Sequence, residues 1–88
     1  MKDLEKLENE IITNFIGNRI NIELIGDITY TLKIENAKFL LNRVYLIFSD
    51  EKENQLNICL DEVGEISIEE GMIEIYFNYN ENLRIYTE

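Results

Sequence analysis

Acidic side chains dominate the residues of this chain that could do chemistry. The 88 residues include 18 Asp and Glu against eight Lys and Arg, with one cysteine and no histidine. Without histidine, the chain cannot build a Ser-His-Asp triad, a Cys-His pair or a histidine-ligated metal site. Cys59 lies between two apolar residues of a strand pattern, where a lone thiol is typical of a small core residue rather than of a nucleophile.

Pairs of carboxylates are the remaining route to acid–base catalysis. Two adjacent pairs occur, Asp61-Glu62 and Glu69-Glu70. Neighbouring residues of a strand point to opposite faces, so neither pair is ready to share one substrate. A chain of this length also leaves little room for a substrate cleft beside its core. We therefore expect that the protein is not an enzyme.

One acidic loop invites comparison with a calcium site. Its candidate ligands are spaced loosely like those of an EF-hand loop: Asp50, Lys52, Asn54 and Asp61. Gln55 stands where such a loop needs glycine, and no glutamate closes the loop. The flanking segments read as strands rather than helices. The sequence therefore predicts a solvated turn here, with no metal and no cofactor.

Charge is unevenly distributed along the chain. Residues 1–60 carry ten acidic and seven basic side chains, whereas residues 61–88 carry eight acidic side chains and the single base Arg84. The formal net charge of −10 argues against direct binding to nucleic acid or to an anionic membrane, since both need clustered Lys and Arg. A basic protein is the partner that such a charge favours.

A helix is the first element that must position these side chains. Residues 3–16 are predicted to be helical, with Asp3 as the N-cap and Gly17 as the stop. Apolar residues recur at helical spacing, so one side of the helix must pack against other elements. This stripe comprises Leu4, Leu7, Ile11, Ile12 and Phe15.

From residue 19 onward the apolar period switches to two, which predicts strands. Polar or glycine-containing turns separate runs over 19–24, 28–34, 43–48, 56–60, 65–69, 72–78 and 83–87. The segment 36–42 is less regular. Its apolar run Phe39-Leu40-Leu41 is expected either to cover an open end of the core or to form a homodimer contact. Tyr30 and Tyr45 are expected to lie in the core.

The predicted fold is α+β and mostly β. It has an N-terminal helix followed by a strongly bent antiparallel sheet or small barrel of six to seven short strands. The length of 88 residues predicts one domain, 1–88. Residues 1–6 lack the apolar core of a signal peptide, and no run reaches the roughly 18 apolar residues of a membrane span. We therefore expect a cytoplasmic protein.

Two segments resemble parts of the Sm-like and SH3-like small barrels. They are Phe15–Ile22, where the helix enters the first strand, and Ile58–Ile66, near the last barrel strands. The resemblance implies strongly bent strands after an N-terminal helix. The chain departs from the family because no glycine bends the strand Tyr30–Ile34. The basic residues of RNA-binding Sm proteins are not recognisable either, so the resemblance concerns the fold and not RNA binding.

Strand alternation predicts an acidic surface on the last three strands. If the isoleucines of 65–69 and 72–78 point inward, the opposite face carries carboxylates and tyrosines. The candidate partner-binding residues are Glu65, Glu69, Glu74, Tyr76, Tyr86 and Glu88. Such a face is either a binding surface, where tyrosines supply contact area, or a charged surface that keeps a small protein soluble.

The sequence favours a non-enzymatic acidic binding protein that occupies a basic, nucleic-acid-binding surface of a partner protein. Small acidic inhibitors and nucleic-acid mimics made by phages, including anti-CRISPR and other anti-defence proteins, are similar in size and charge. The alternative is an Sm-like or SH3-like structural module that self-associates into a dimer or ring. A small-ligand pocket inside a barrel ranks third, because no convergent polar residues are recognisable for it.

Overall fold

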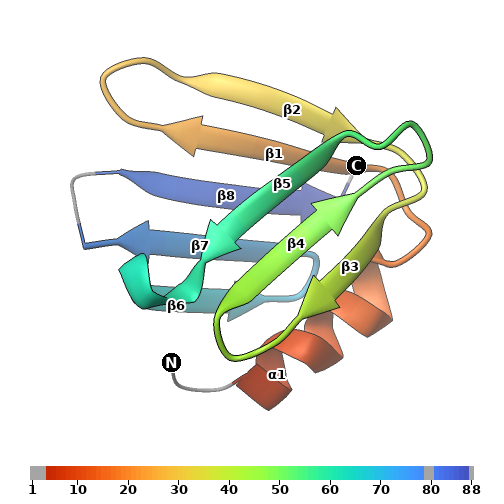
Figure 1. Cartoon of the computed structure of the whole chain (residues 1–88), viewed down its shortest axis with the longest axis horizontal. Helices are drawn as coiled ribbons and strands as arrows, with labels where there is room; N and C mark the ends of the chain where they lie inside the picture. Colours follow the sequence, from red (N-terminus) through yellow and green to blue (C-terminus); the bar gives the residue numbers. More distant parts are fainter. Residues whose placement is uncertain (1–3, 79–80, 88) are drawn as a thin grey trace.

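The computed structural model describes residues 4–78 and 81–87, and it confirms an N-terminal helical segment followed by antiparallel strands (Figure 1). The elements are α1 (Leu4–Glu10), η1 (Ile11–Phe15), β1 (Ile20–Ile25), β2 (Tyr30–Ile34), β3 (Lys38–Leu41), β4 (Tyr45–Ser49), β5 (Gln55–Cys59), η2 (Leu60–Glu62), β6 (Val63–Glu69), β7 (Met72–Phe77) and β8 (Asn82–Thr87). The fold is therefore α+β and mostly β, as the sequence predicts. The predicted N-cap, Asp3, lies outside the described residues.

The strands form two antiparallel sheets. The large sheet has the order β2-β1-β8-β7-β6, and the small sheet has the order β3-β4-β5. Figure 1 shows the small sheet in front of the large one, with its strands running obliquely to those behind. The sequence predicts six to seven strands, and the described residues form eight. β2 and β6 are the edges of the large sheet.

β3 is the strand that the sequence pattern misses. Phe39 and Leu41 pack against the core, while Leu40 between them is 57% exposed. The side chains therefore alternate between two faces although their hydropathy does not. Of the two roles expected for this run, covering the core is the one that the positions of Phe39 and Leu41 support.

The helical segment changes its hydrogen-bond pattern halfway. After α1, η1 is a π-helical turn closed by the bond from the backbone N of Ile16 to the carbonyl O of Ile11, at 3.0 Å. Leu7, Ile11 and Phe15 are fully buried, but Ile12, predicted in the same stripe, is 52% exposed. Ile12 directly follows Ile11, and the rotation of one residue about the helix axis turns it away from the buried face.

The core lies between the two sheets and the helix. Buried apolar side chains come from each of these layers and include Leu7, Ile11, Ile20, Leu46, Ile73, Ile75 and Ile85. Phe15 of η1 meets Phe48 of β4 edge to face, with ring centroids 6.4 Å apart and an interplanar angle of 84°. This aromatic contact joins the helical segment to the small sheet.

Tyr30 and Tyr45, expected in the core, are exposed instead. Their exposed fractions are 62% and 45%. Tyr45 precedes the buried Leu46 in β4, so it points to the outer face of the small sheet. Tyr30 lies on the edge strand β2, beyond the part of the large sheet that the small sheet covers, where it lines an open groove.

The carboxylate of Glu10 joins the helix to the β6–β7 turn through a hydrogen bond. Glu10 Oε2 accepts a hydrogen bond from the backbone N of Gly71 at 2.9 Å and another from Asn14 Nδ2 at 2.6 Å. Gly71 has a φ of +74°, in the left-handed region that glycine adopts without strain. The turn therefore needs glycine, and it presents the amide of that glycine to the helix.

Candidate functional site

The predicted binding residues share the outer face of the large sheet. The buried residues of β7 and β8 point to the core and are Ile73, Ile75, Leu83 and Ile85. Strand alternation and cross-strand register bring together on the opposite face Glu65, Glu69, Glu74, Tyr76 and Tyr86. Glu88 lies outside the described residues. The shared face agrees with the strand alternation in the sequence, while its role in binding stays a prediction.

The centre of this face is less acidic than the sequence suggests. The register places Arg84 of β8 between Glu23 of β1 and Glu74 of β7. Arg84 Nε lies 3.6 Å from Glu74 Oε1, and the two side chains are 38% and 18% exposed. One cation therefore faces two carboxylates, which partly balances the negative charge at this point.

Tyr76 adds a second contact to the same glutamate. Its hydroxyl donates a hydrogen bond to Glu74 Oε2 at 2.8 Å. This hydrogen bond raises the pKa of Tyr76, because ionisation would remove the donated proton. Partial desolvation and the negative charges of Glu74 and Glu65 raise the pKa further, while the positive charge of Arg84 opposes them. Both carboxylate oxygens of Glu74 are thus engaged within the face.

Negative charge collects along β6. The sequence has no Lys or Arg between Lys52 and Arg84, a stretch that holds eight acidic residues. We call the exposed carboxylates of β6 and its flanking turns the acidic β6 edge; they are Asp61, Glu62, Glu65, Glu69 and Glu70. Two of these, Glu65 and Glu69, belong to the predicted binding face. The strongest negative charge therefore lies at the side of the predicted face rather than at its centre.

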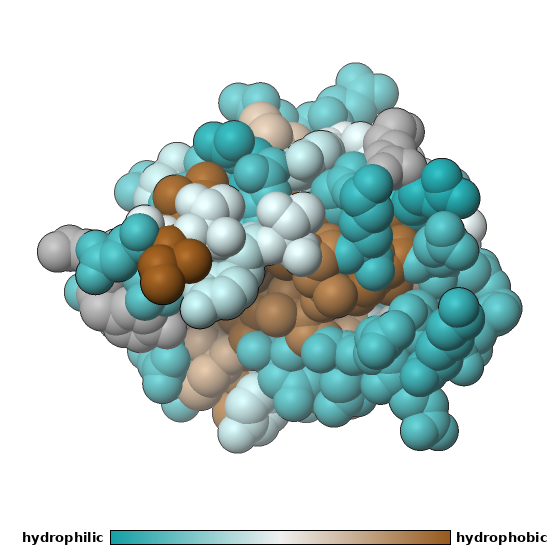
Figure 2. Space-filling view, turned by 90° about the horizontal axis from the view of Figure 1, so that it is seen from above, coloured by the Kyte–Doolittle hydropathy of each residue, from teal (hydrophilic) through white to brown (hydrophobic). Residues whose placement is uncertain are grey.

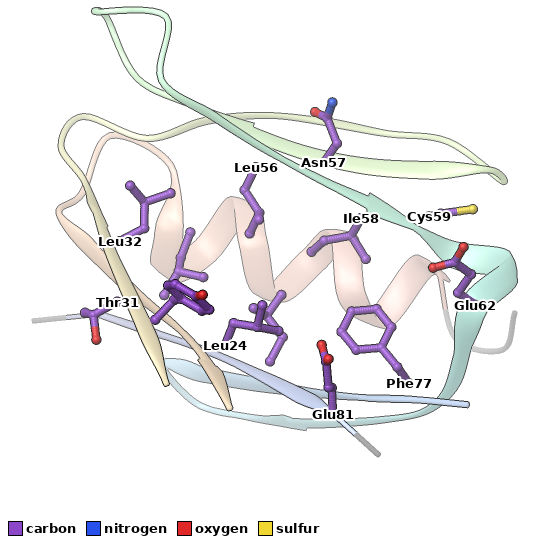
Figure 3. A pocket seen from close by; sticks show the side chains of 13 residues that line it. Leu24, Thr31, Leu32, Leu56, Asn57, Ile58, Cys59, Glu62, Phe77 and Glu81 are labelled. Atoms are coloured by element: carbon purple, nitrogen blue, oxygen red, sulfur yellow. The ribbon is translucent and has the colours of Figure 1, made fainter. Parts of the chain in front are cut away.

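A groove opens between the two sheets, away from the helix. Its volume is about 350 Å³, within the range of about 300–1,000 Å³ that is typical of ligand sites. Figure 2 shows an apolar floor flanked by hydrophilic side chains, and Figure 3 shows the helix behind the groove. The apolar lining includes Leu24, Leu32, Leu56, Ile58, Phe77 and Leu83. Because the helix fills only the far side, the near side of the large sheet's inner face stays open.

Two carboxylates lie at one end of this groove. Among its described lining residues, Glu62 and Glu81 are the charged ones. Figure 3 shows the ring of Phe77 between them, with both carboxylates directed into the groove. The sequence suggests no convergent polar residues for a pocket, and this pair corrects that view. The two residues are 19 positions apart, so no local pattern marks them.

The outer face of the small sheet has a different character. The sequence of β3, β4 and the turn between them contains no carboxylate but includes Lys38 and Arg43. The exposed fractions of Leu40, Val44 and Tyr45 are 57%, 45% and 45%. The charge of the molecule is therefore polarised: acidic along β6, and apolar with basic residues on the small sheet.

The loop compared with a calcium site is a hydrogen-bonded turn. Asp50 Oδ1 accepts hydrogen bonds from the backbone N of Lys52 at 2.8 Å and of Asn54 at 2.9 Å, and Asp50 Oδ2 accepts one from Asn54 Nδ2 at 2.9 Å. These bonds lower the pKa of Asp50, the side-chain bond from Asn54 most of all. Across residues 4–78 and 81–87, no group of three or more His, Cys, Asp or Glu side chains could hold a metal ion.

Comparison with known proteins gives no match, whether to a family model, a curated protein or a solved structure. In the part of the chain that the structure describes, no helix is long and apolar enough to cross a membrane. The fold and its surfaces define a small, mostly β protein with an acidic sheet edge and an open apolar groove.

Proposed function

We propose that this protein is a non-enzymatic acidic binding protein that occupies a basic, nucleic-acid-binding surface of a partner protein. The acidic β6 edge supports this proposal, because five exposed carboxylates gather on one strand and its turns, in a stretch of sequence without a base. Extended basic surfaces belong mainly to proteins that bind nucleic acid. The bound protein would block nucleic acid by covering the surface and by repelling phosphate.

The carboxylate spacing favours charge complementarity over a close copy of a phosphate row. Glu65 and Glu69 are four residues apart on β6, which is about 13 Å at roughly 3.3 Å per residue. Phosphates of one DNA strand follow each other every 3.4 Å or so along the helix axis. We therefore expect an association that depends on electrostatic attraction and weakens as ionic strength rises.

Size and charge extend the proposal to a biological role, that of an inhibitor of the anti-CRISPR or another anti-defence type, made by a phage. Such an inhibitor needs no catalytic group; it needs a surface that competes with nucleic acid. Tyr76 and Tyr86 stand beside the carboxylates, and tyrosine rings supply contact area at small entropic cost. With nucleic-acid-binding partners of this kind, the protein would act in the cytoplasm.

Capture of partners from a bacterial lysate, at low and at high salt and with mass spectrometry, tests the proposal. Glu65→Lys plus Glu69→Lys reverses the charge of the β6 edge. Asp27→Lys plus Glu53→Lys is the matched control, since it makes the same charge change at exposed turns away from β6. We expect a nucleic-acid-binding protein to be retained at low salt by the wild type and the control, and to be lost from the edge variant. Equal retention by both variants, or retention at high salt, would contradict the proposal.

Self-association is a second candidate function, favoured by the apolar outer face of the small sheet. Exposed apolar patches of this kind often mark contacts between proteins. Light scattering over a concentration series measures the mass directly. If a dimer or ring forms through this face, Leu40→Glu should dissociate it, because the substitution would bury a charge in the contact. A constant monomer mass would exclude this candidate.

A further inference from the structure

We infer that the groove binds an extended segment of the partner protein. This segment pairs with the free edge of β2 at one side of the groove, crosses the apolar floor, and places a lysine or arginine beside Glu62 and Glu81 at the other side. The inference rests on the proposed function, because its occupant belongs to a basic partner protein. It concerns a surface that shares Glu62 with the acidic β6 edge but does not include Glu65 or Glu69.

The two edges of the large sheet differ in how well they can accept another strand. β6 has an irregular register between Val63 and Glu65 and carries several carboxylates, and bulges and charges of this kind protect an edge from further pairing. β2 pairs with β1 in unbroken register, and its one charged residue is Lys33. β2 is therefore the edge at which strand addition meets less resistance.

The side of β2 that faces the groove becomes more exposed toward the open end. Ile34 is fully buried, Leu32 is 36% exposed and Tyr30 is 62% exposed. Ile28, just before the strand, continues the series at 66%. The core of the protein accounts for Ile34 but not for the exposed Leu32, Tyr30 and Ile28. A segment that lies along β2 would cover them and remove their apolar surface from water.

β5 forms the opposite lip of the groove. It is the edge strand of the small sheet, and its residues Leu56–Cys59 line the groove. The groove is therefore bounded by two strand edges. Proteins that bind peptides by strand addition use an exposed strand edge, at which main-chain hydrogen bonds provide affinity and pockets for alternate side chains provide specificity.

The charge at the end of the groove selects the chemistry of the segment. Lysine and arginine lay their stems along apolar surface while the charged head reaches a polar partner. At this end the head would meet Glu62 and Glu81, with the ring of Phe77 between them (Figure 3). A cation near an aromatic face gains further attraction. Nucleic acid and anionic lipid carry the wrong charge for this end.

A second copy of the chain fits this groove poorly. It would bring another net charge of −10 to a contact that already contains two carboxylates. The one cation of its β2, Lys33, alternates to the face opposite Leu32. It would therefore not reach the groove of the other copy when two β2 strands pair. A basic segment of a different protein satisfies both the apolar lining and the charge.

Selection of short random peptides displayed on phage, against the purified full chain, tests the inference. We expect the selected peptides to alternate apolar and polar residues and to carry a lysine or arginine. One selected peptide with a fluorophore then gives the dissociation constant by anisotropy. Leu32→Lys, and separately Glu62→Gln plus Glu81→Gln, should each weaken binding about tenfold or more. Glu8→Gln plus Glu53→Gln removes the same charge at exposed positions outside the groove lining and should change binding by less than about twofold.

Hydrogen exchange provides a readout of the pairing itself. The bound peptide should slow exchange of backbone amides in β2 and leave those in β6 unchanged. Circular dichroism confirms that each variant is folded before its affinity is compared. The inference is overturned if no peptide is enriched, if enriched peptides lack a cation, if Leu32→Lys binds as tightly as the wild type, or if protection falls on another strand.

The groove and the proposed function fail in distinguishable ways. If the lysate partner is captured through Glu65 and Glu69 but groove variants capture it equally well, the groove inference is wrong and the acidic β6 edge stands. If groove variants lose the partner while Glu65→Lys plus Glu69→Lys retains it, the acidic edge is wrong and the groove stands. The peptide affinity is measured on purified protein, so it does not depend on which partner the lysate supplies.

Discussion

Replacing Glu10 with alanine should weaken the contact between the helix and the β6–β7 turn. Its carboxylate accepts hydrogen bonds from Gly71 N at 2.9 Å and from Asn14 Nδ2 at 2.6 Å. The Asn14 bond joins helical positions i and i+4, which is worth about 0.2–0.5 kcal/mol. A hydrogen bond to a charged group contributes about 1.5–3 kcal/mol when buried, and partial exposure reduces the Gly71 bond to about 1 kcal/mol. We therefore expect Glu10→Ala to lower the free energy of unfolding by about 1–1.5 kcal/mol.

Urea denaturation followed by circular dichroism measures this loss. A chain of this size has a total stability of about 4–13 kcal/mol, so the change is resolvable, and it corresponds to a fall in Tm of about 4–12 °C. Glu8→Ala is the matched control, because Glu8 is exposed on the same helix and undergoes the same change in helix propensity. It should alter the stability by less than about 0.5 kcal/mol.

Equal stability of Glu10→Ala and Glu8→Ala would refute this reasoning, since the bond to Gly71 would then contribute nothing. Asn14→Ala separates the two bonds of the carboxylate. If Asn14→Ala is as destabilising as Glu10→Ala, the effect belongs to the helix and not to its contact with the turn. Hydrogen exchange gives a local check: the amide of Gly71 should exchange faster in Glu10→Ala and at the wild-type rate in Asn14→Ala.

Three further predictions concern the turn, the tyrosine and the core. Gly71→Ala should lower the free energy of unfolding by about 1–2 kcal/mol, because its φ is +74°. Gly26→Ala, at a glycine without positive φ, is the control. If urea denaturation gives the same loss of stability for both variants, the role of φ is contradicted. Glu74→Gln should lower the pKa of Tyr76 toward its ordinary value in an absorbance titration. The pKa of Tyr76 is raised in the folded state, so its hydrogen bond to Glu74 stabilises the fold at pH values below the unfolded pKa. This stabilisation is lost as the pH rises through the folded pKa. An unchanged pKa of Tyr76 in Glu74→Gln would contradict the role of the hydrogen bond. Phe48→Leu should cost about 1–2 kcal/mol in urea denaturation through loss of the aromatic pair and of buried volume, and a neutral effect would show that the pair is not stabilising.

Local patterns in the sequence were sufficient for most of the elements. The helix follows from apolar spacing, and the β6–β7 hairpin follows from alternation around the Glu70-Gly71 turn, because each depends on neighbours along the chain. β3 was missed for a physical reason: Leu40 points to solvent but is as apolar as the inward-facing residues beside it. The hydropathy pattern therefore does not reveal that these side chains alternate between two faces.

The groove depends on contacts between distant segments and could not be predicted. Tyr30 has the same local pattern as a core residue, and only the short reach of the small sheet leaves it exposed. Glu62 and Glu81 lie at the same end of the groove because β6, β7 and β8 form a meander that returns the chain to the same end of the sheet. Arg84 is recognisable in the sequence as the single base of residues 61–88, but its position between two glutamates required the strand order.

The groove and the acidic β6 edge meet at η2. This short turn joins β5, one lip of the groove, to β6. Glu62 of η2 faces the groove, whereas Glu65, three residues later, faces outward opposite Tyr76. A partner segment held with its cation at Glu62 would therefore have its flanking basic residues close to the most acidic part of the surface. On this view the two edges of the large sheet have complementary tasks: β2 pairs with the segment, and β6 attracts the rest of a basic partner while its charge and bulge keep it from pairing.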